Sequence, residues 1–380
     1  MSSGVYMSED SLAEYRIIVQ EIPFQSNWTH EYLDSLLDTL PRINSHDPKN
    51  PEWRETPLIE LDLNEYHSDL RAFVKNEADR QSNPDGLLKN RMAHEVEPVT
   101  YRHIAENLWS KRLNGKLEQM PIPIPTICTA GNAGIALANA AHRYGLPPIK
   151  LLLDVNTSPS IVDALQKSWA SIYLAPLDFN IFTGNKEPYT PMQLRLLTNN
   201  DAGFDITSDK APIKPFKDYY DWHWVAEIFN KKPDKVYGPF GTGDWFANGL
   251  TWQREIAWNS TNPDPRLACN IEDVANISIL AAEPESNDSR ARKLVGMKPF
   301  VYYSENDIQA MRLGGFTGMH TGIGSVSEEY LQRAYSIMRN KMETSYDGSA
   351  GLALLLKHQD EGKINPKEYH IVVNTGRGLQ

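Results

Sequence analysis

One lysine stands in a context where its amine could react. Lys89 lies in the stretch NPDGLLKNR (83–91), after a turn signal of Asn, Pro, Asp and Gly and before a helical run predicted to start near Arg91. An ammonium is disfavoured near the positive end of a helix dipole, so the neutral amine is easier to reach there. A neutral lysine amine is the nucleophile of Schiff-base chemistry. The alternative is a solvated surface lysine, as most lysines are.

A glycine turn that follows a predicted strand could hold an anion. The turn TAGNAG (129–134) precedes an alanine-rich helix, and its glycines let the backbone approach a ligand. The N–H groups of Gly131, Asn132 and Ala133, at the start of that helix, can bind a carboxylate, and the Asn132 amide could face a ring oxygen. The plainer interpretation is a turn in which Asn132 caps the helix.

Two more turns of this kind occur later in the chain. PFGTGDW (239–245) predicts a phosphate cup of backbone N–H groups, to which Thr242 can add its hydroxyl. It is neither a P-loop, because no Lys-Ser/Thr follows the glycines, nor a dinucleotide fingerprint, because the glycine spacing differs. NTGRG (374–378) ends the last predicted strand, where Thr375 could present a neutral hydroxyl. The alternative there is an ordinary C-terminal loop.

The segments that must position these residues alternate between strand and helix patterns, which indicates an α/β fold with parallel sheets covered on both faces. We expect strands at 57–63, 72–77, 126–130, 150–155, 171–177, 234–239, 277–285 and 370–376. We expect helices at 31–40, 91–109, 133–145, 160–170, 216–230, 245–258, 326–341 and 348–359. Residues 46–57 are predicted to be a connector. The loops that set specificity are predicted to lie within residues 178–218 and 304–325.

Composition restricts the class of partner. The formal net charge of −11 argues against nucleic acid, which needs a basic field, and favours a small-molecule substrate. Two cysteines are too few for a disulfide scaffold, so a reducing compartment, the cytoplasm, is expected, with Cys128 as a small buried residue of a strand. The N-terminus shows no secretion signal and no apolar run is long enough to span a bilayer, so no membrane partner is expected. We expect no metal.

Taken together and in order, these segments resemble the fold-type II enzymes that use pyridoxal phosphate, among them tryptophan synthase β, cysteine synthase, serine dehydratase and threonine synthase. The resemblance covers residues 56–379 and rests on TPLIEL (56–61), FVKNEADRQSNPDGLLKNR (73–91), TAGNAGIALANAA (129–141), PFGTGD (239–244), AAEPE (281–285) and VVNTGRGL (372–379). The last segment is most similar to the threonine synthase ending.

The resemblance implies a role for each candidate residue. Lys89 would form the Schiff base with pyridoxal 5′-phosphate and carry the substrate's α-proton, and Asn132 would hydrogen-bond the ring hydroxyl. The phosphate would lie on Gly241, Thr242 and Gly243. Thr375 would meet the pyridine nitrogen. The substrate carboxylate would be held by Thr129, Ala130, Gly131, Asn132 and Ala133.

The resemblance also implies an architecture and an activity. We expect two open, mostly parallel-sheet α/β domains with the cofactor in the cleft between them, as in tryptophan synthase β. These are a larger cofactor domain (56–88 plus 206–380), a smaller mobile domain (89–205) and an N-terminal extension (1–55), and the expected assembly is a homodimer. The expected reaction is β-elimination, of the lyase or ammonia-lyase kind, or β-replacement on a small amino acid. Alternatives are γ-replacement of the threonine synthase type and a catalytically silent scaffold that binds the cofactor.

The chain departs from the family pattern beside the predicted site. Leu87 stands where the family often has Ser, and Arg377 replaces the histidine of the threonine synthase ending. Asp244 and Trp245 replace a Gly and a small residue after the phosphate turn. An acid beside a phosphate dianion is unfavourable unless it caps the helix and faces away.

Overall fold

The chain forms two compact units in a computed structural model. The model describes residues 9–39, 55–63, 70–83, 86–92, 122, 124–200, 203–207, 216, 219, 233–258, 274–295 and 304–378. The smaller unit comprises Met1–Asn44, Ala93–Phe216 and Leu379–Gln380, and the larger unit comprises Ser45–Met92 and Lys217–Gly378. Residues 9–39 of the predicted extension therefore group with the smaller unit, whereas Lys89 groups with the larger one.

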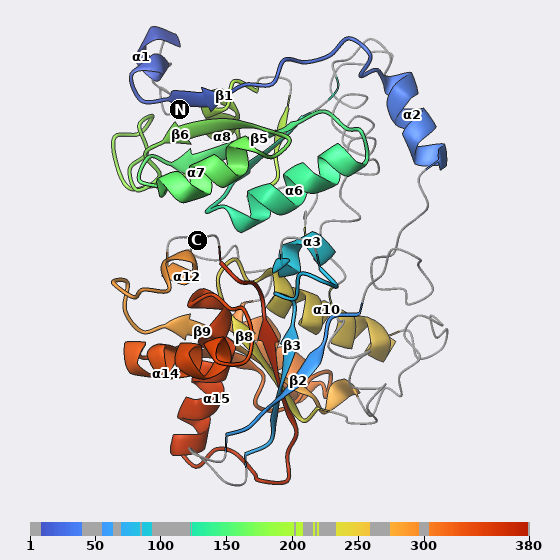
Figure 1. Cartoon of the computed structure of the whole chain (residues 1–380), viewed down its shortest axis with the longest axis vertical. Coiled ribbons are helices and arrows are strands. Elements are labelled where there is room, and N and C mark those ends of the chain that lie inside the picture. The colour runs from blue at the N-terminus through green and yellow to red at the C-terminus, as the bar shows by residue number, and fades with distance from the viewer. Residues whose placement is uncertain are drawn as a thin grey trace. The chain divides into compact units, whose positions relative to one another are not determined.

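The sheet of the smaller unit has the strand order β1-β6-β5-β4-β7. Its strands are β1 (Ile17–Gln20), β4 (Pro125–Cys128), β5 (Ile149–Asp154), β6 (Ala170–Ala175) and β7 (Phe204–Asp205), of which only β1 runs antiparallel to its neighbour. The near-continuous buried runs of β5 and β6 are typical of strands covered on both faces. Helices α6 (Asn132–Arg143) and α7 (Pro159–Gln166) lie next to each other over this sheet (Figure 1).

The sheet of the larger unit has the order β10-β9-β8-β11-β3-β2, with β2 antiparallel at one edge. Its strands are β2 (Leu58–Leu61), β3 (Ala72–Asn76), β8 (Lys235–Pro239), β9 (Ser278–Pro284), β10 (Gly322–Val326) and β11 (His370–Asn374). Helices α14 (Glu328–Arg339) and α15 (Ala350–Asp360) pack together against it, and α15 is buried from Ala350 to Leu356. The other helices among the described residues of this unit are α3 (Leu88–Met92), α10 (Asp244–Trp258), α12 (Arg292–Val295) and α13 (Glu305–Leu313), and a short 3-10 turn, η5 (Asp347–Ser349), precedes α15.

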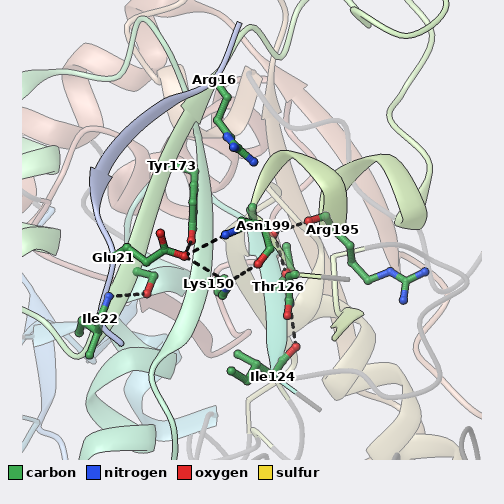
Figure 2. Close-up of polar contacts among 12 residues, drawn as sticks. Arg16, Glu21, Ile22, Ile124, Thr126, Lys150, Tyr173, Arg195 and Asn199 are labelled. Atoms are coloured by element: carbon green, nitrogen blue, oxygen red, sulfur yellow. Dashed lines mark hydrogen bonds and ion pairs between the residues drawn. The ribbon is translucent and has the colours of Figure 1, made fainter. Parts of the chain in front are cut away.

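The N-terminal segment is part of the smaller unit's sheet. It forms α1 (Glu9–Ala13), β1 and α2 (His30–Thr39), and β1 pairs with β6. The carboxylate of Glu21 accepts a hydrogen bond from the Tyr173 hydroxyl at 2.7 Å and pairs with Lys150 Nζ at 3.6 Å (Figure 2). Leu12 is buried in the core beside Leu152. A segment whose role could not be deduced from its sequence thus forms an edge of this sheet.

Most predicted elements that fall on described residues are present in the structure. The α/β class with mostly parallel sheets is confirmed. Elements that the sequence did not predict include α8 (Pro191–Leu197) and β7 within 178–218, α13 within 304–325, and β10, which begins in that range and ends at Val326. The helices predicted at 216–230 and over most of 91–109, and most of the connector at 46–57, lie outside the described residues. Among the helices described here, none has both the length and the apolar character that crossing a bilayer requires.

Candidate active site

The loop that carries Lys89 is built by a buried asparagine and a glycine. The Asn83 side-chain amide donates to the carbonyls of Glu77 at 2.7 Å and Leu87 at 2.9 Å, which closes the loop. Gly86 has φ +58°, and a Cβ there would lie 2.6 Å from the Ala78 carbonyl oxygen, so no other residue fits without strain. The loop leads directly into α3, whose second residue is Lys89.

Residues 375–377 support this loop through backbone hydrogen bonds. The Leu88 N–H donates to the Thr375 carbonyl at 3.0 Å, and Leu87 forms an antiparallel bridge with Gly376. The Arg377 N–H donates to the Gly86 carbonyl at 3.3 Å. The NTGRG turn therefore lies beside the lysine loop. Leu87, where the related enzymes often have Ser, is fully buried.

The glycine turn after β8 meets the Lys89 side chain. Lys89 Nζ lies 3.2 Å from the Thr242 hydroxyl oxygen and 2.7 Å from Asp244 Oδ2. Asp244 is the first residue of α10, and its side chain is only 8% exposed. The departure at Asp244 therefore has a structural consequence: the carboxylate faces Lys89 instead of turning away.

The neighbouring departure, Trp245, is a packing residue. Its indole N–H donates to the Pro239 carbonyl, and its ring lies against Gly238. A Cβ at Gly238 would come within 2.6 Å of the ring, so the strand needs glycine where the tryptophan packs. This packing holds the start of α10, and with it Asp244, against the end of β8.

Three predicted site segments therefore converge on one edge of one sheet. Strands β8, β11 and β3 are neighbours in that order, and their carboxyl ends lead to the 241–243 turn, to Thr375 and to the Lys89 loop. Buried Asn374 links two of these ends, because its side-chain amide donates to Asn76 Oδ1 at 2.8 Å. Asn374 and Asn76 were not among the predicted site residues, although an asparagine that ends a buried strand is a recognisable signal.

A buried ionic network lies under the lysine loop. Lys75 Nζ pairs with Glu77 Oε1 at 3.2 Å, and both side chains are fully buried. The hydroxyls of Thr56 and Tyr219 donate to the same carboxylate oxygen at 2.9 and 2.8 Å. Buried charges need such partners, so the glutamate that follows β3 stabilises the base of the loop.

The turn TAGNAG lies in the smaller unit, at the carboxyl end of β4. The Thr129 hydroxyl oxygen accepts the N–H groups of Gly131 at 3.0 Å and Gly134 at 3.2 Å. Gly131, at φ 124°, is the N-cap of α6, so the interpretation of Asn132 as the cap is wrong and Asn132 is the first helical residue. The structure thus groups Lys89, Thr242 and Thr375 in the larger unit, and Thr129 to Ala133 in the smaller one.

The Cys128 thiol is a poor nucleophile in this structure. Burial, followed by the charges of Asp205 and Asp154, raises the pKa of the Cys128 thiol to about 12, so the thiolate is scarce at neutral pH. Within the described part of the chain, no group of three or more His, Cys, Asp and Glu side chains is arranged to hold a metal. The groups that the structure brings together at this edge of the sheet are the Lys89 amine, the Thr242 hydroxyl and the Asp244 carboxylate.

Comparison with known proteins gives a structural likeness only. No protein-family model matches the sequence, and no curated protein matches it. A hydrogen sulfide-producing enzyme from Fusobacterium nucleatum superposes with a TM-score of 0.55 at 15% identity, over 90% of this chain and 98% of that one. Diaminopropionate ammonia lyase from Escherichia coli gives 0.53 at 13%, over 96% and 93%. A pyridoxal 5′-phosphate-dependent aspartate racemase gives 0.54 at 13%, over 94% and 98%.

These likenesses show the fold. The chain has the mixed α/β architecture, with two mostly parallel sheets, of the fold-type II pyridoxal phosphate enzymes, as the resemblance implied. At this level of identity the likeness extends to the backbone arrangement and not to the reaction.

Proposed function

We propose that this chain is an enzyme that binds pyridoxal 5′-phosphate and acts on a small amino acid by β-elimination or β-replacement. The observation that carries the proposal is the position of Lys89, 3.2 Å from Thr242 and beside the Thr375 segment, at the carboxyl ends of adjacent parallel strands. Open parallel sheets hold their ligands at this edge. The ammonia lyase and the hydrogen sulfide-producing enzyme among the structural neighbours support elimination.

The residues present fit the cofactor at three points and oppose it at one. Lys89 offers an amine, Thr242 and the first N–H groups of the 15-residue helix α10 offer donors for a phosphate, and Thr375 offers a neutral hydroxyl for the ring nitrogen. The opposing group is Asp244, whose carboxylate lies among the phosphate donors. We therefore assign the phosphate to Gly241, Thr242 and Gly243.

The reaction would use the chain's own groups as follows. When bound, the cofactor supplies an electron sink for negative charge at the substrate's α-carbon. Lys89 Nζ would take the α-proton as a base and, as the resulting ammonium, give a proton to the group that leaves the β-carbon. Thr375 would offer the ring nitrogen a neutral hydroxyl and would leave it largely unprotonated, which would weaken the electron sink and favour rapid loss of a leaving group.

The substrate carboxylate is assigned to the turn of the smaller unit. Thr129 accepts two N–H groups through its oxygen and keeps its own hydroxyl hydrogen for a carboxylate. The Gly131 N–H donates to Thr129, and we assign the substrate carboxylate to Thr129 together with the backbone of residues 130–133. We assign the ring hydroxyl to the Asn132 amide.

The test of cofactor binding is spectroscopic. Wild-type protein with added pyridoxal phosphate is expected to gain a visible absorbance band, and borohydride followed by mass spectrometry should place the label on Lys89. Lys89→Ala should lose both signals. The matched control is Lys357→Ala, which removes another ion-paired lysine of the larger unit, 2.9 Å from Glu285. A wild type that stays colourless and unlabelled would refute the proposal.

The reaction class is tested by products. Ammonia and 2-oxo acid released from serine, threonine or diaminopropionate would establish elimination, which we place slightly ahead of replacement. Phosphate released from phosphohomoserine would instead establish γ-replacement, which the VVNTGRGL ending favours. Cofactor binding without any spectral response across the twenty amino acids would establish the silent scaffold, which the carboxylate of Asp244 in the anion turn favours.

We further propose that the enzyme is a cytoplasmic homodimer. The chain's two cysteines suit a reducing compartment. Light scattering should give twice the 43.1 kDa mass of one chain, and a monomer mass would exclude the dimer.

A further inference from the structure

The carboxylate of Asp244 occupies a place built for an anion. Its Oδ2 atom accepts Lys89 Nζ at 2.7 Å and also accepts the Thr242 hydroxyl. It stands at the first residue of α10, where the helix dipole favours negative charge. A cation, a hydroxyl and a helix start therefore converge on a negative group that belongs to the chain itself.

The position of this carboxylate is fixed by its neighbours. Trp245 is anchored through its indole N–H to the Pro239 carbonyl and packs on Gly238. The Asn248 side-chain amide donates to the Asp244 carbonyl at 2.7 Å. The backbone on both sides of the Asp244 Cα is thus held, and only the side-chain torsions can move the carboxylate.

An external anion would need the same partners. A phosphate monoester carries more charge than a carboxylate and would take the Thr242 hydroxyl, the N–H groups at the start of α10 and the cation. Two anions a few ångströms apart repel each other in a poorly solvated site. Phosphate can therefore bind only against Asp244 or after its carboxylate has turned out.

We infer that Asp244 is an internal competitor for the phosphate group and sets how tightly this turn holds the cofactor. The consequence for the proposed enzyme is weak, exchangeable cofactor binding. This consequence rests on the proposed function, whereas the competition itself concerns any phosphate at the 241–243 turn. Asp244 is a specificity-determining residue in this sense, because it discriminates against dianions.

A purely structural role for Asp244 makes a different prediction. An acid in the first turn of a helix stabilises that helix through the dipole and its N–H groups. Asparagine is nearly isosteric and also suits a helix start, so Asp244→Asn keeps this role while it removes the charge. A structural residue would leave anion affinity unchanged in that variant.

The decisive experiment measures binding of inorganic phosphate by isothermal titration calorimetry at fixed ionic strength. Asp244→Asn is expected to lower the Kd roughly tenfold or more, because a contacting negative charge is removed. The matched control is Glu368→Gln, which removes the carboxylate of another lysine pair, Lys235–Glu368 at 2.8 Å, at the opposite end of the same sheet. That control should leave the Kd within about twofold. An unchanged or higher Kd in Asp244→Asn would overturn the inference.

A second variant keeps the inference testable if Asp244→Asn does not fold. Asp244→Ser, another good helix-start residue, should tighten phosphate binding in the same direction, and thermal unfolding reports whether each variant is folded. Should neither variant fold, wild-type protein decides: phosphate bound with submicromolar Kd would overturn the inference, and Kd in the millimolar range supports it.

Failure of the inference and failure of the proposed function give different results. Pyridoxal phosphate that labels Lys89 in wild type, together with a phosphate Kd that is the same in Asp244→Asn, refutes the competition alone. Tighter phosphate binding in Asp244→Asn without labelling of Lys89 in any variant refutes the proposed function alone.

Discussion

At the scale of single residues, Thr129 shows how one hydroxyl can shape a turn and remain available to a ligand. It is buried, and its oxygen accepts two N–H groups of the TAGNAG turn. Valine keeps the shape and removes the acceptor, so Thr129→Val should lower the free energy of unfolding by about 1–3 kcal/mol. Urea denaturation checks this.

Serine provides the control for that prediction. Thr129→Ser keeps the hydroxyl and loses the methyl group that lies near Gly134. It should retain most of the stability. An equal loss in both variants would mean that packing of the methyl group, and not the hydrogen bonds, holds the turn.

Gly238 is the residue on which the position of Trp245 depends. Gly238→Ala places a methyl group within 2.6 Å of the indole ring, so we expect overpacking to cost about 1–3 kcal/mol of unfolding free energy. Thermal or urea unfolding measures the loss. Trp245→Leu should partly restore stability to Gly238→Ala, and a double variant no better than the single one would contradict this account.

At the scale of single residues, the sequence could predict which residues stand at the site. Lys89 is marked by the turn before it, and Thr242 by the glycines on either side, because these signals are local. The direction of the Asp244 side chain was not predictable. It depends on Lys89, more than 150 residues away in the chain, and on the order of strands in the sheet.

At the scale of elements, β1 is fastened to the smaller unit through Glu21. Burial by itself would raise the pKa of Glu21, but hydrogen bonds from Tyr173 and Asn199 and the charge of Lys150 together hold it below its usual value. The carboxylate therefore stabilises the folded state above the ordinary Glu pKa, and this contribution is lost as the pH falls through the folded pKa.

Substitution of Glu21 tests this fastening. Glu21→Gln should make protease cleavage within residues 9–39 faster at pH 7, because it removes the ion pair with Lys150 and weakens the charge-assisted bond from Tyr173. Limited proteolysis with mass spectrometry measures it. At a pH well below the folded Glu21 pKa the two proteins should be cleaved alike. A difference that persists there would point to a cause other than charge.

The elements that sequence reasoning found and missed differ in length and composition. Helix α14 was predicted because its apolar positions repeat over several turns, and α15 because its continuous apolar run is typical of a buried helix. Helix α8 has seven residues, too few for a period to show. Its capping box, in which Thr190 and Gln193 bond each other's backbone N–H, was the available signal. Strand β10 contains two glycines in five residues, which hides its strand character.

At the scale of the whole molecule, two histidines of the larger unit, half-buried His358 and fully buried His370, make stability depend on pH. Burial is the main cause that lowers the pKa of His358 and of His370, each to about 4. Both rings lie 5.9 Å from that of Tyr237. The unfolded chain binds protons at these positions below about pH 6.5, whereas the folded chain resists them until about pH 4.

The free energy of unfolding should therefore fall as the pH is lowered from about 6.5 to about 4. Urea denaturation at a series of pH values measures the slope. His358→Gln should flatten part of it, because a group that cannot titrate no longer contributes. A slope that is unchanged in His358→Gln would assign the acid sensitivity to other groups.

The support that residues 375–377 give to the Lys89 loop has a consequence for biosynthesis. Strand β3 pairs with β2 and β11, and the lysine loop that follows it is bonded to Thr375, Gly376 and Arg377. A ribosome makes residues 72–92 early and residues 370–378 some 280 residues later, so the loop cannot close while the chain is still growing through its middle. During that interval the lysine belongs to an unfinished sheet with an open edge. A nascent chain therefore lacks the formed lysine loop until residues 375–377 have been made, and under the proposed function it would capture no cofactor before then.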